Sequence, residues 1–257
     1  MRTALVRRTV LTASAVSLAV LATACGSGSS DTKADAKPPV SAPPASAAPA
    51  AKAKTDAELA DVLVAQADLP AYVVKPATPA EVAAAAGAKS DKPECLPLVK
   101  AQSMAPVGTS VGAARTKVAA KGKEAAPDAS PEDKLKAAMD ALGTTATSVT
   151  LASYEGKGAE EAFATIKTAG TACAGGYTGG QGSDSLKIAK VAPGASVTAG
   201  DAALAYTVTG DADGEKFTME LVVVRKGNTL ATFSALSLTG TAEQPKPVVD
   251  AQVKKLG

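Results

Sequence analysis

The first 25 residues constrain the chain most, because they indicate in which compartment the rest of it folds. Met1 to Arg8 contains three arginines and no acidic residue, and residues 10–24 carry no charge. This apolar run of roughly fifteen residues is short of the ~20 that a membrane-spanning helix needs. A positive start, a short apolar middle and small residues at the end are typical of a secretory signal. Residues 1–24 are therefore predicted to be a signal peptide, the alternative being a retained membrane helix.

Two cleavage patterns meet at Cys25. Ala22-Thr23-Ala24 fits the A-x-A rule of ordinary signal peptidase. The segment from Leu21 to Cys25 also resembles a bacterial lipobox, in which the chain is cut before a cysteine that then carries lipid, although Ala22 stands where leucine is usual. Arg7-Arg8 is similar to a twin-arginine export signal and equally to an ordinary basic start, so both export routes stay open.

The number of cysteines favours lipid on Cys25. The chain has three, Cys25, Cys95 and Cys173, and an odd cysteine in an exported protein would remain a reactive thiol. Lipidation of Cys25 leaves Cys95 and Cys173 as one pair. Because exported proteins keep disulfides and the two residues do not form a C-x-x-C redox motif, we expect a structural disulfide between them rather than a redox pair.

Composition then divides the exported chain in two. Residues 25–54 are rich in Ala, Pro and Ser and cannot bury enough apolar surface to offset the entropy of ordering them. They are predicted to be a disordered tether with an r.m.s. span of roughly 30 Å. Residues 55–257 are long enough for one domain with a real core.

The first half of this domain is predicted to be helical. Thr55 and Thr78 each precede a glutamate by three residues, which is the capping-box signature of a helix start. The first helix carries Leu59, Val62, Leu63 and Gln66 on one face and is expected to end near Pro70. A third helix is predicted from Pro131, with Leu135, Met139 and Leu142 on one face. Residues 103–129 are polar, rich in lysine and aperiodic, and are predicted to be a mobile loop.

The second half changes to strand periodicity. Alternation from Thr147 predicts a strand, and a helix over residues 158–172 follows, with Phe163, Ile166, Ala169 and Cys173 on its core side. Four strands are predicted at 186–191, 203–209, 217–225 and 230–238, and a last helix at 247–256. This order predicts an α+β fold, one antiparallel meander with helices covering a face.

Several of these features occur together in a known family. They are Gln66-Ala67-Asp68-Leu69-Pro70 after a first helix, Cys95 in the next loop, Cys173 at the end of the helix before the meander, and Arg225-Lys226-Gly227-Asn228 before the last strand. Together they resemble the extracellular sensor domain of the actinobacterial PknH kinases, which also occurs on stand-alone lipoproteins. The resemblance covers about residues 55–256. It implies a sensing or ligand-binding cleft and no catalytic residues.

Catalysis and metal binding are not expected. Ser110 lies in a G-x-S-x-G pattern, but the chain has no histidine to serve as the base of a triad, and the apolar strand and helix that frame a nucleophile elbow are missing from the pattern around it. Asp211, Asp213 and Glu215 are too few for a calcium loop and are interpreted as a solvated hairpin turn. No cofactor is expected. A net charge of +2 and few aromatic residues argue against nucleic acid as a partner.

Three classes of function follow. The first is a lipoprotein, anchored to the outer face of the cytoplasmic membrane through Cys25, that displays a sensor or ligand-binding domain for an unknown small ligand. The second is a non-catalytic lipoprotein that binds or scaffolds another envelope protein. The third and least favoured is an enzyme. An apolar cleft between sheet and helices, wide enough for a ligand, would distinguish the first class from the second.

Overall fold

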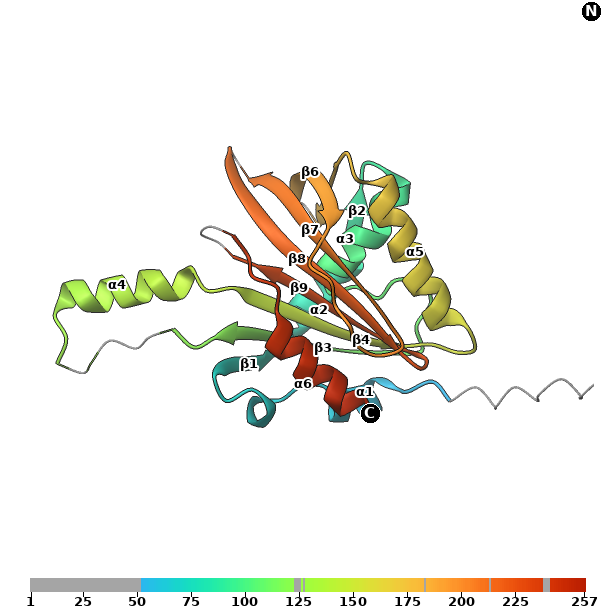
Figure 1. Ribbon diagram of the computed structural model, residues 1–257, viewed down its shortest axis with the longest axis horizontal. Coiled ribbons are helices and arrows are strands. Elements are labelled where there is room, and N and C mark those ends of the chain that lie inside the picture. The colour runs from blue at the N-terminus through green and yellow to red at the C-terminus, as the bar shows by residue number, and fades with distance from the viewer. Residues whose placement is uncertain (1–51, 123–125, 127, 183, 213, 238–240) are drawn as a thin grey trace, which may run out of the picture. The chain divides into compact units, whose positions relative to one another are not determined.

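The computed structural model of the protein describes residues 52–122, 126, 128–182, 184–212, 214–237 and 241–257. These residues form one antiparallel sheet of nine strands with helices packed against it (Figure 1). The predicted α+β class, with an antiparallel meander, helices and one disulfide, is confirmed. The predicted signal peptide, Cys25 and residues 26–51 of the predicted tether lie outside the described residues.

Every neighbouring pair of strands in the sheet is antiparallel. From one edge to the other the described strands are β1 (Tyr72–Pro76), β3 (Gly112–Ala120), β4 (Ala146–Ser153), β9 (Thr229–Leu236), β8 (Glu215–Lys226), β7 (Ala202–Ala212), β6 (Asp184–Pro193), β5 (Tyr177–Gln181) and β2 (Ala88–Ser90). Strands β5 to β9 form a continuous meander, and β1 and β2 are the two edges.

The described residues also contain six α-helices and two short 3-10 helices. They are α1 (Asp56–Val62), η1 (Gln66–Asp68), α2 (Pro79–Ala86), η2 (Pro93–Cys95), α3 (Leu96–Gln102), α4 (Pro131–Leu142), α5 (Gly158–Ala172) and α6 (Lys246–Leu256). Helices α1 and α2 begin with the capping boxes that the sequence predicts, at Thr55 with Glu58 and at Thr78 with Glu81.

The sheet has a separate core on each face. Side chains of a strand alternate between faces, and β8 shows this directly: Leu221 and Val223 enter one core, and Val222 and Val224 enter the other. Helices α3 and α5 cover the first, which we call the α5-side core. Helices α1 and α6 cover the second, the α6-side core. Helices therefore cover both faces, where the sequence analysis expected one.

The second half of the domain follows the predicted order. The helix expected at 158–172 is α5, and Ile166, Ala169 and Cys173 are buried on its core side, with Phe163 partly buried against the same core. The four predicted strands are β6 to β9, each within a few residues of its expected bounds. These segments were predictable because large apolar residues recur at a clear period, which is the strongest signal of secondary structure in a sequence.

The prediction of a mobile loop over residues 103–129 is wrong. Strand β3 occupies Gly112–Ala120 and pairs with both β1 and β4. Its inward residues are Gly112, Ala114, Thr116 and Val118, and all four are buried. Three of them are too small or too polar to stand out as apolar positions, which is why the alternation was overlooked.

Two further predictions in the first half need correction. Cys95, placed in a loop from the sequence, ends helix η2, and helix α3 follows it directly. Pro93 and Pro97 lie in the first turns of these helices, where a missing N–H costs nothing. The first helix ends at Val62, before Pro70, so Gln66 belongs to the separate helix η1 and does not share its face.

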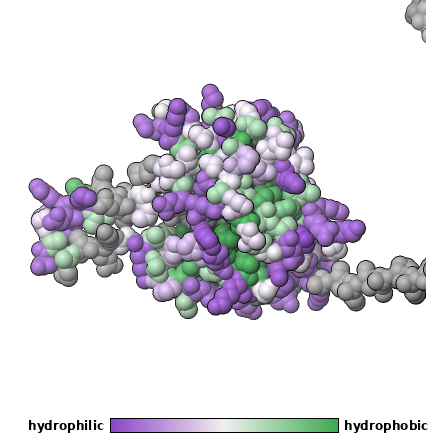
Figure 2. Space-filling model, in the orientation of Figure 1, coloured by the Kyte–Doolittle hydropathy of each residue, from purple (hydrophilic) through white to green (hydrophobic). Residues whose placement is uncertain are grey.

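Helix α4 forms where the sequence predicts it, and the one residue of its predicted apolar face whose side chain is described is not buried. Leu135, expected on the buried face, is 65% exposed. The other two residues of that face, Met139 and Leu142, lie outside the residues whose side chains are described. In Figure 1 the helix stands away from the sheet, beyond the ends of β3 and β4. Figure 2 shows mostly hydrophilic residues in this region, whereas apolar residues gather in the middle of the main body.

Candidate ligand-binding groove

A groove of about 500 Å³ lies between α1, the segment that follows it, and strands β1 and β3. Eight of its twelve lining residues are Ala, Leu, Val or Pro, and the four polar ones are Asp56, Gln66, Arg115 and Thr116. Small-molecule sites are concave, mostly apolar, commonly 300–1,000 Å³ in volume, and carry a few polar groups that orient the ligand. The groove has this size and this composition.

The groove exists because β1 is shorter than the strand it pairs with. Strand β1 pairs only with residues 116–120 of β3, which leaves the first part of β3 open at its edge. The start of the domain covers this open end: the Asp56 carboxylate accepts a hydrogen bond from the Ala113 N–H at 2.7 Å. A side chain at Gly112 would come within 2.6 Å of the Lys54 carbonyl, so only glycine allows the chain to pass this closely.

One wall of the groove is held by Gln252 of α6. This side chain is fully buried; its amide oxygen accepts from the Val64 N–H at 2.9 Å, and its amide nitrogen donates to the Val62 carbonyl at 2.8 Å. Val64 itself lines the groove. The glutamine thus fixes an extended segment in the way that a neighbouring strand would, by bonding a carbonyl and the N–H two residues later.

The opposite wall is held in the same manner by Gln66. Its amide nitrogen donates to the Tyr72 carbonyl at 2.7 Å, and its amide oxygen accepts from the Val74 N–H at 3.1 Å. These groups lie on the outer edge of β1, and Val74 lines the groove. Unlike Gln252, Gln66 is exposed.

Asp68 connects this wall to α6. Its carboxylate accepts from the Ala65 N–H at 2.8 Å and from the Lys255 ammonium at 2.9 Å. The Ala65 N–H, followed by the hydrogen bond from Lys255, lowers the pKa of Asp68. Gln66, Asp68 and the buried Leu69 belong to the loop signature singled out in the sequence, and their contacts show that its residues shape the groove.

Arg115 lines the groove at β3, and its side chain projects to the face of the sheet opposite the buried Ala114 and Thr116. Its Nε donates to the Met104 carbonyl at 2.6 Å, and the described residues offer no hydrogen bond or carboxylate contact to its two terminal nitrogens. The residue is half-buried; burial lowers its pKa, and the nearby Asp56 carboxylate partly offsets this. An arginine stays protonated at neutral pH even so, and its charge lies on the face of β3 from which Lys117 pairs with Glu81.

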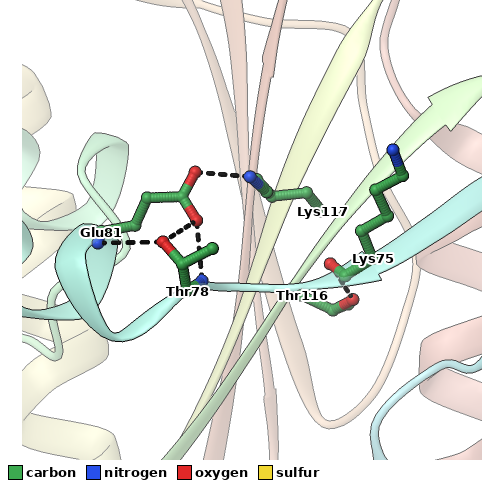
Figure 3. Close-up of polar contacts among 5 residues, drawn as sticks. All are labelled: Lys75, Thr78, Glu81, Thr116 and Lys117. Atoms are coloured by element: carbon green, nitrogen blue, oxygen red, sulfur yellow. Dashed lines mark hydrogen bonds and ion pairs between the residues drawn. The ribbon is translucent and has the colours of Figure 1, made fainter.

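The other polar groups of the groove are already engaged. Gln66 and Asp56 bond to the backbone as described above, and the Thr116 hydroxyl donates to the Lys75 carbonyl at 2.9 Å. Figure 3 shows this contact beside a second cluster, in which Lys117 of β3 points toward Glu81 of α2 and forms an ion pair with it, while Lys75 points away.

Glu81 ties α2 to the sheet next to the groove. Its carboxylate accepts from the N–H of Thr78 at 2.7 Å and from the Thr78 hydroxyl at 2.9 Å, in addition to the ion pair with Lys117. The hydrogen bond from Lys117, followed by those from Thr78, lowers the pKa of Glu81 to about 2. The cluster is a structural tie: none of its three residues lines the groove.

The two predicted disulfide cysteines are brought together. Cys95 at the end of η2 bonds Cys173 at the end of α5, with a Cα–Cα distance of 5.8 Å, and both are fully buried in the α5-side core. The disulfide joins two helical segments on one face of the sheet and lies apart from the groove-lining residues. Cys25, the predicted lipidation site, is outside the described residues and stays a prediction.

The remaining sequence candidates lie elsewhere. Ser110 is followed by strand β3, whereas a nucleophile elbow leads into a helix. Asp211 accepts a hydrogen bond from the Gly214 N–H at 2.8 Å in the β7–β8 turn, and Asp213 lies outside the described residues. Among the described residues no three His, Cys, Asp or Glu side chains gather as metal ligands, and no helix is both long and apolar enough to cross a membrane.

The groove was not predicted from the sequence because strand β3, which lines it, was not predicted. Arg115 and Thr116 both fall in the segment interpreted as a mobile loop. The overlooked signal is the strict alternation of Ala113, Arg115 and Lys117 with residues that turn out to be buried.

The comparisons with known proteins give a likeness in fold to a solved structure. No family model matches the chain, and no curated protein matches it. The crystal structure of the extracellular domain of PknH from Mycobacterium tuberculosis is similar over 80% of this chain and 97% of that chain, with 11% sequence identity and a TM-score of 0.43. At this identity and TM-score the likeness assigns neither a family nor a function to the chain.

Proposed function

We propose that the protein is a membrane-anchored lipoprotein that displays a ligand-binding α+β domain outside the cytoplasmic membrane, with lipid on Cys25 as its anchor. The observation that carries the proposal is the Cys95–Cys173 disulfide. Stable disulfides are rare in the cytosol, which supports an extracytoplasmic domain. Since the other two cysteines pair with each other, Cys25 is the odd cysteine, and it follows a segment that has the features of a secretory signal.

The groove between α1, β1 and β3 supports a binding role for the domain. It is mostly apolar and of ligand size. A purely structural contact between a helix and a sheet would fill such a space with side chains, because protein interiors are close-packed. The groove therefore favours a sensor or ligand-binding domain over a scaffold.

The second candidate, an envelope protein that binds another protein, is favoured by one observation. Helix α4 stands away from the sheet and exposes Leu135. Under either candidate the domain is proposed to be non-catalytic. Ser110 leads into a strand, and the chain contains no histidine that could activate it.

Two measurements test the proposal. In the native host, Cys25→Ser should move the protein from the membrane fraction to the soluble extracytoplasmic fraction, because lipid on Cys25 is the proposed anchor. A Ser variant that still pellets with membranes at high salt would refute the anchor. Native mass spectrometry of the Cys25→Ser protein from its own host should show added mass that Ala60→Trp removes, because Ala60 is exposed on α1 and lines the groove. Added mass that persists in Ala60→Trp would place the ligand elsewhere.

A further inference from the structure

The groove reaches the main chain of β3 as well as its inward side chains. Four consecutive residues of this strand line it, Ala113 to Thr116, although the side chains of a strand alternate between two faces. Ala114 and Thr116 are buried on the face that α1 covers, whereas the Arg115 side chain projects to the other face and bonds Met104 there. Ala113 and Arg115 therefore meet the groove through their main-chain atoms.

The main-chain groups of these two residues point to the outer edge of β3. In an antiparallel ladder every second residue turns both its N–H and its C=O to the same neighbour. Arg115 faces β1 in this way, because its carbonyl accepts the Ala77 N–H at 3.3 Å, and Ala113 faces the same edge, where its N–H donates to Asp56. The Ala113 carbonyl and the Arg115 N–H remain, and neither has a partner among the described residues.

This open pair repeats an arrangement that is filled twice beside it. The side-chain amides of Gln252 and Gln66 each bond a carbonyl and the N–H two residues later, as described above. The Ala113 carbonyl and the Arg115 N–H are a third pair of the same kind, on half-buried residues. Unpaired main-chain groups that are partly removed from water are costly, so a ligand with a matching donor and acceptor gains by filling them.

The groups already engaged on either side decide how a ligand can add. A segment antiparallel to β3 pairs with both the N–H and the C=O of a residue, so it would set a carbonyl against the Asp56 carboxylate and an N–H against the Ala77 N–H. A segment parallel to β3 uses only the open pair, because one of its residues donates to Ala113 and accepts from Arg115. The ligand therefore presents its donor at the Asp56 end.

The Asp56 carboxylate favours a positively charged donor at that end. Its Oδ1 accepts the N–H of Ala113, the residue whose carbonyl is open, and its Oδ2 has no hydrogen bond or ion pair within the described part of the chain. The α-ammonium of a peptide supplies this charge together with donors for both oxygen atoms, and a carbonyl follows it one carbon atom later. Capture of an amino-terminal amine by backbone groups is a recurring mode of peptide recognition.

The first side chain of such a peptide enters the apolar part of the groove. A residue bonded to the open pair lies opposite Ala114 and shares its face of the sheet. On that face the groove is walled by Leu63, Val64 and Val74, which pack on the same core as Ala114. An apolar side chain gains free energy by leaving water there, whereas a polar one loses its hydrogen bonds.

We propose that the groove binds the free amino terminus of a peptide whose first side chain is apolar, with the α-ammonium between Asp56 and the Ala113 carbonyl and the first carbonyl at the Arg115 N–H. This inference rests on the proposed binding function and specifies its ligand class. The probe is leucyl-alanyl-alanine amide, titrated calorimetrically into the full exported chain carrying Cys25→Ser. It is expected to bind one-to-one. Its N-acetylated form and seryl-alanyl-alanine amide should each bind roughly tenfold or more weakly, because they lack the charged donor or the apolar side chain.

Variants of α1 test the charged contact. Asp56→Asn keeps an acceptor for the Ala113 N–H and should weaken binding of the leucyl probe roughly two- to fivefold, since Asp56 is exposed and screened by solvent. The control Asp61→Asn removes an exposed charge of the same helix outside the groove and should have no effect. Acetylating the probe should cost less affinity in Asp56→Asn than in the parent, a coupling that a purely structural effect of the substitution would not produce.

Filling the groove tests its location. Ala60→Trp should abolish binding of the leucyl probe, whereas Ala57→Trp, also exposed on α1 but outside the groove, should not. Equal binding of the acetylated probe, tighter binding of free leucine than of the peptide, or no binding of the leucyl probe would overturn the inference. A host-derived ligand that Ala60→Trp displaces but that has no free amino terminus would overturn this inference and leave the binding function standing.

Discussion

Removing the disulfide should cost the domain a large part of its stability. Cys95 and Cys173 are 78 residues apart in sequence, and the closed loop contains α3, β3, α4, β4 and α5. A crosslink over a loop of this length lowers the entropy of the unfolded chain by an amount worth roughly 4.5 kcal/mol at 25 °C. Both cysteines are fully buried in the α5-side core, so replacing them with alanine also removes packed sulfur atoms. The free energy of unfolding of a typical domain is about 5–15 kcal/mol in total.

The assay is urea and thermal unfolding of four proteins: the parent, Cys95→Ala, Cys173→Ala and the double variant. For a domain of about 200 residues the melting temperature should fall by roughly 10 °C in the double variant. Either single variant already breaks the bond, so the double variant should lose little more than each single one. Reducing the parent with a thiol should lower its melting temperature in the same direction. Additive losses in the two single variants, or a melting temperature that reduction leaves unchanged, would refute the reasoning.

The remaining predictions concern three side chains that hold the groove or lie next to it: Gln252, Gln66 and Glu81. Gln252→Leu should cost about 1–3 kcal/mol of unfolding free energy in urea, because it leaves the Val64 N–H and the Val62 carbonyl without partners in a buried site. Gln66→Leu removes three hydrogen bonds to backbone, with Leu69, Tyr72 and Val74, from an exposed side chain and should cost about 1 kcal/mol or less, since water replaces them; equal losses in the two variants would contradict this account. The low pKa of Glu81 stabilises the fold above its ordinary pKa of 4.5, and this contribution is lost as the pH falls toward about 2. Urea unfolding across that range should show a shallower acid-side decline in Glu81→Gln, and an unchanged decline would show that the ion pair with Lys117 contributes nothing.

The helix α5 and the strands that follow it could be predicted from sequence because their buried residues are large. Ile166, Val208, Leu221 and Phe233 recur at helix or strand spacing, and each is fully buried. The disulfide could be predicted because assigning Cys25 to the lipobox-like segment leaves Cys95 and Cys173 as one pair. Neither inference required knowledge of contacts between distant segments.

The first half resisted prediction because its signals are local and weak. Strand β3 builds its buried side largely from Gly112, Ala114 and Thr116, and edge strand β2 has three residues. Pro93 and Pro97 lie at helix starts, but proline suits an extended chain equally well, so they do not reveal the short helices around Cys95. The groove depends on β3 and on two glutamine side chains, Gln66 and Gln252, that bond backbone eight and 188 residues away. Such long-range pairing of a side chain with backbone leaves no periodic trace in the sequence.

The bonds of Gln66 have a consequence for neighbouring copies of the protein. An exposed sheet edge is a template on which strands of other molecules can add, and that hazard grows when proteins are concentrated on a surface. On the outer edge of β1 the Tyr72 carbonyl and the Val74 N–H are occupied by Gln66, the Tyr72 N–H donates to Leu69 at 3.0 Å, and Pro76 has no N–H to offer. Donors for an incoming strand are therefore absent from the described outer edge of β1, and the Gln66 amide removes one of them.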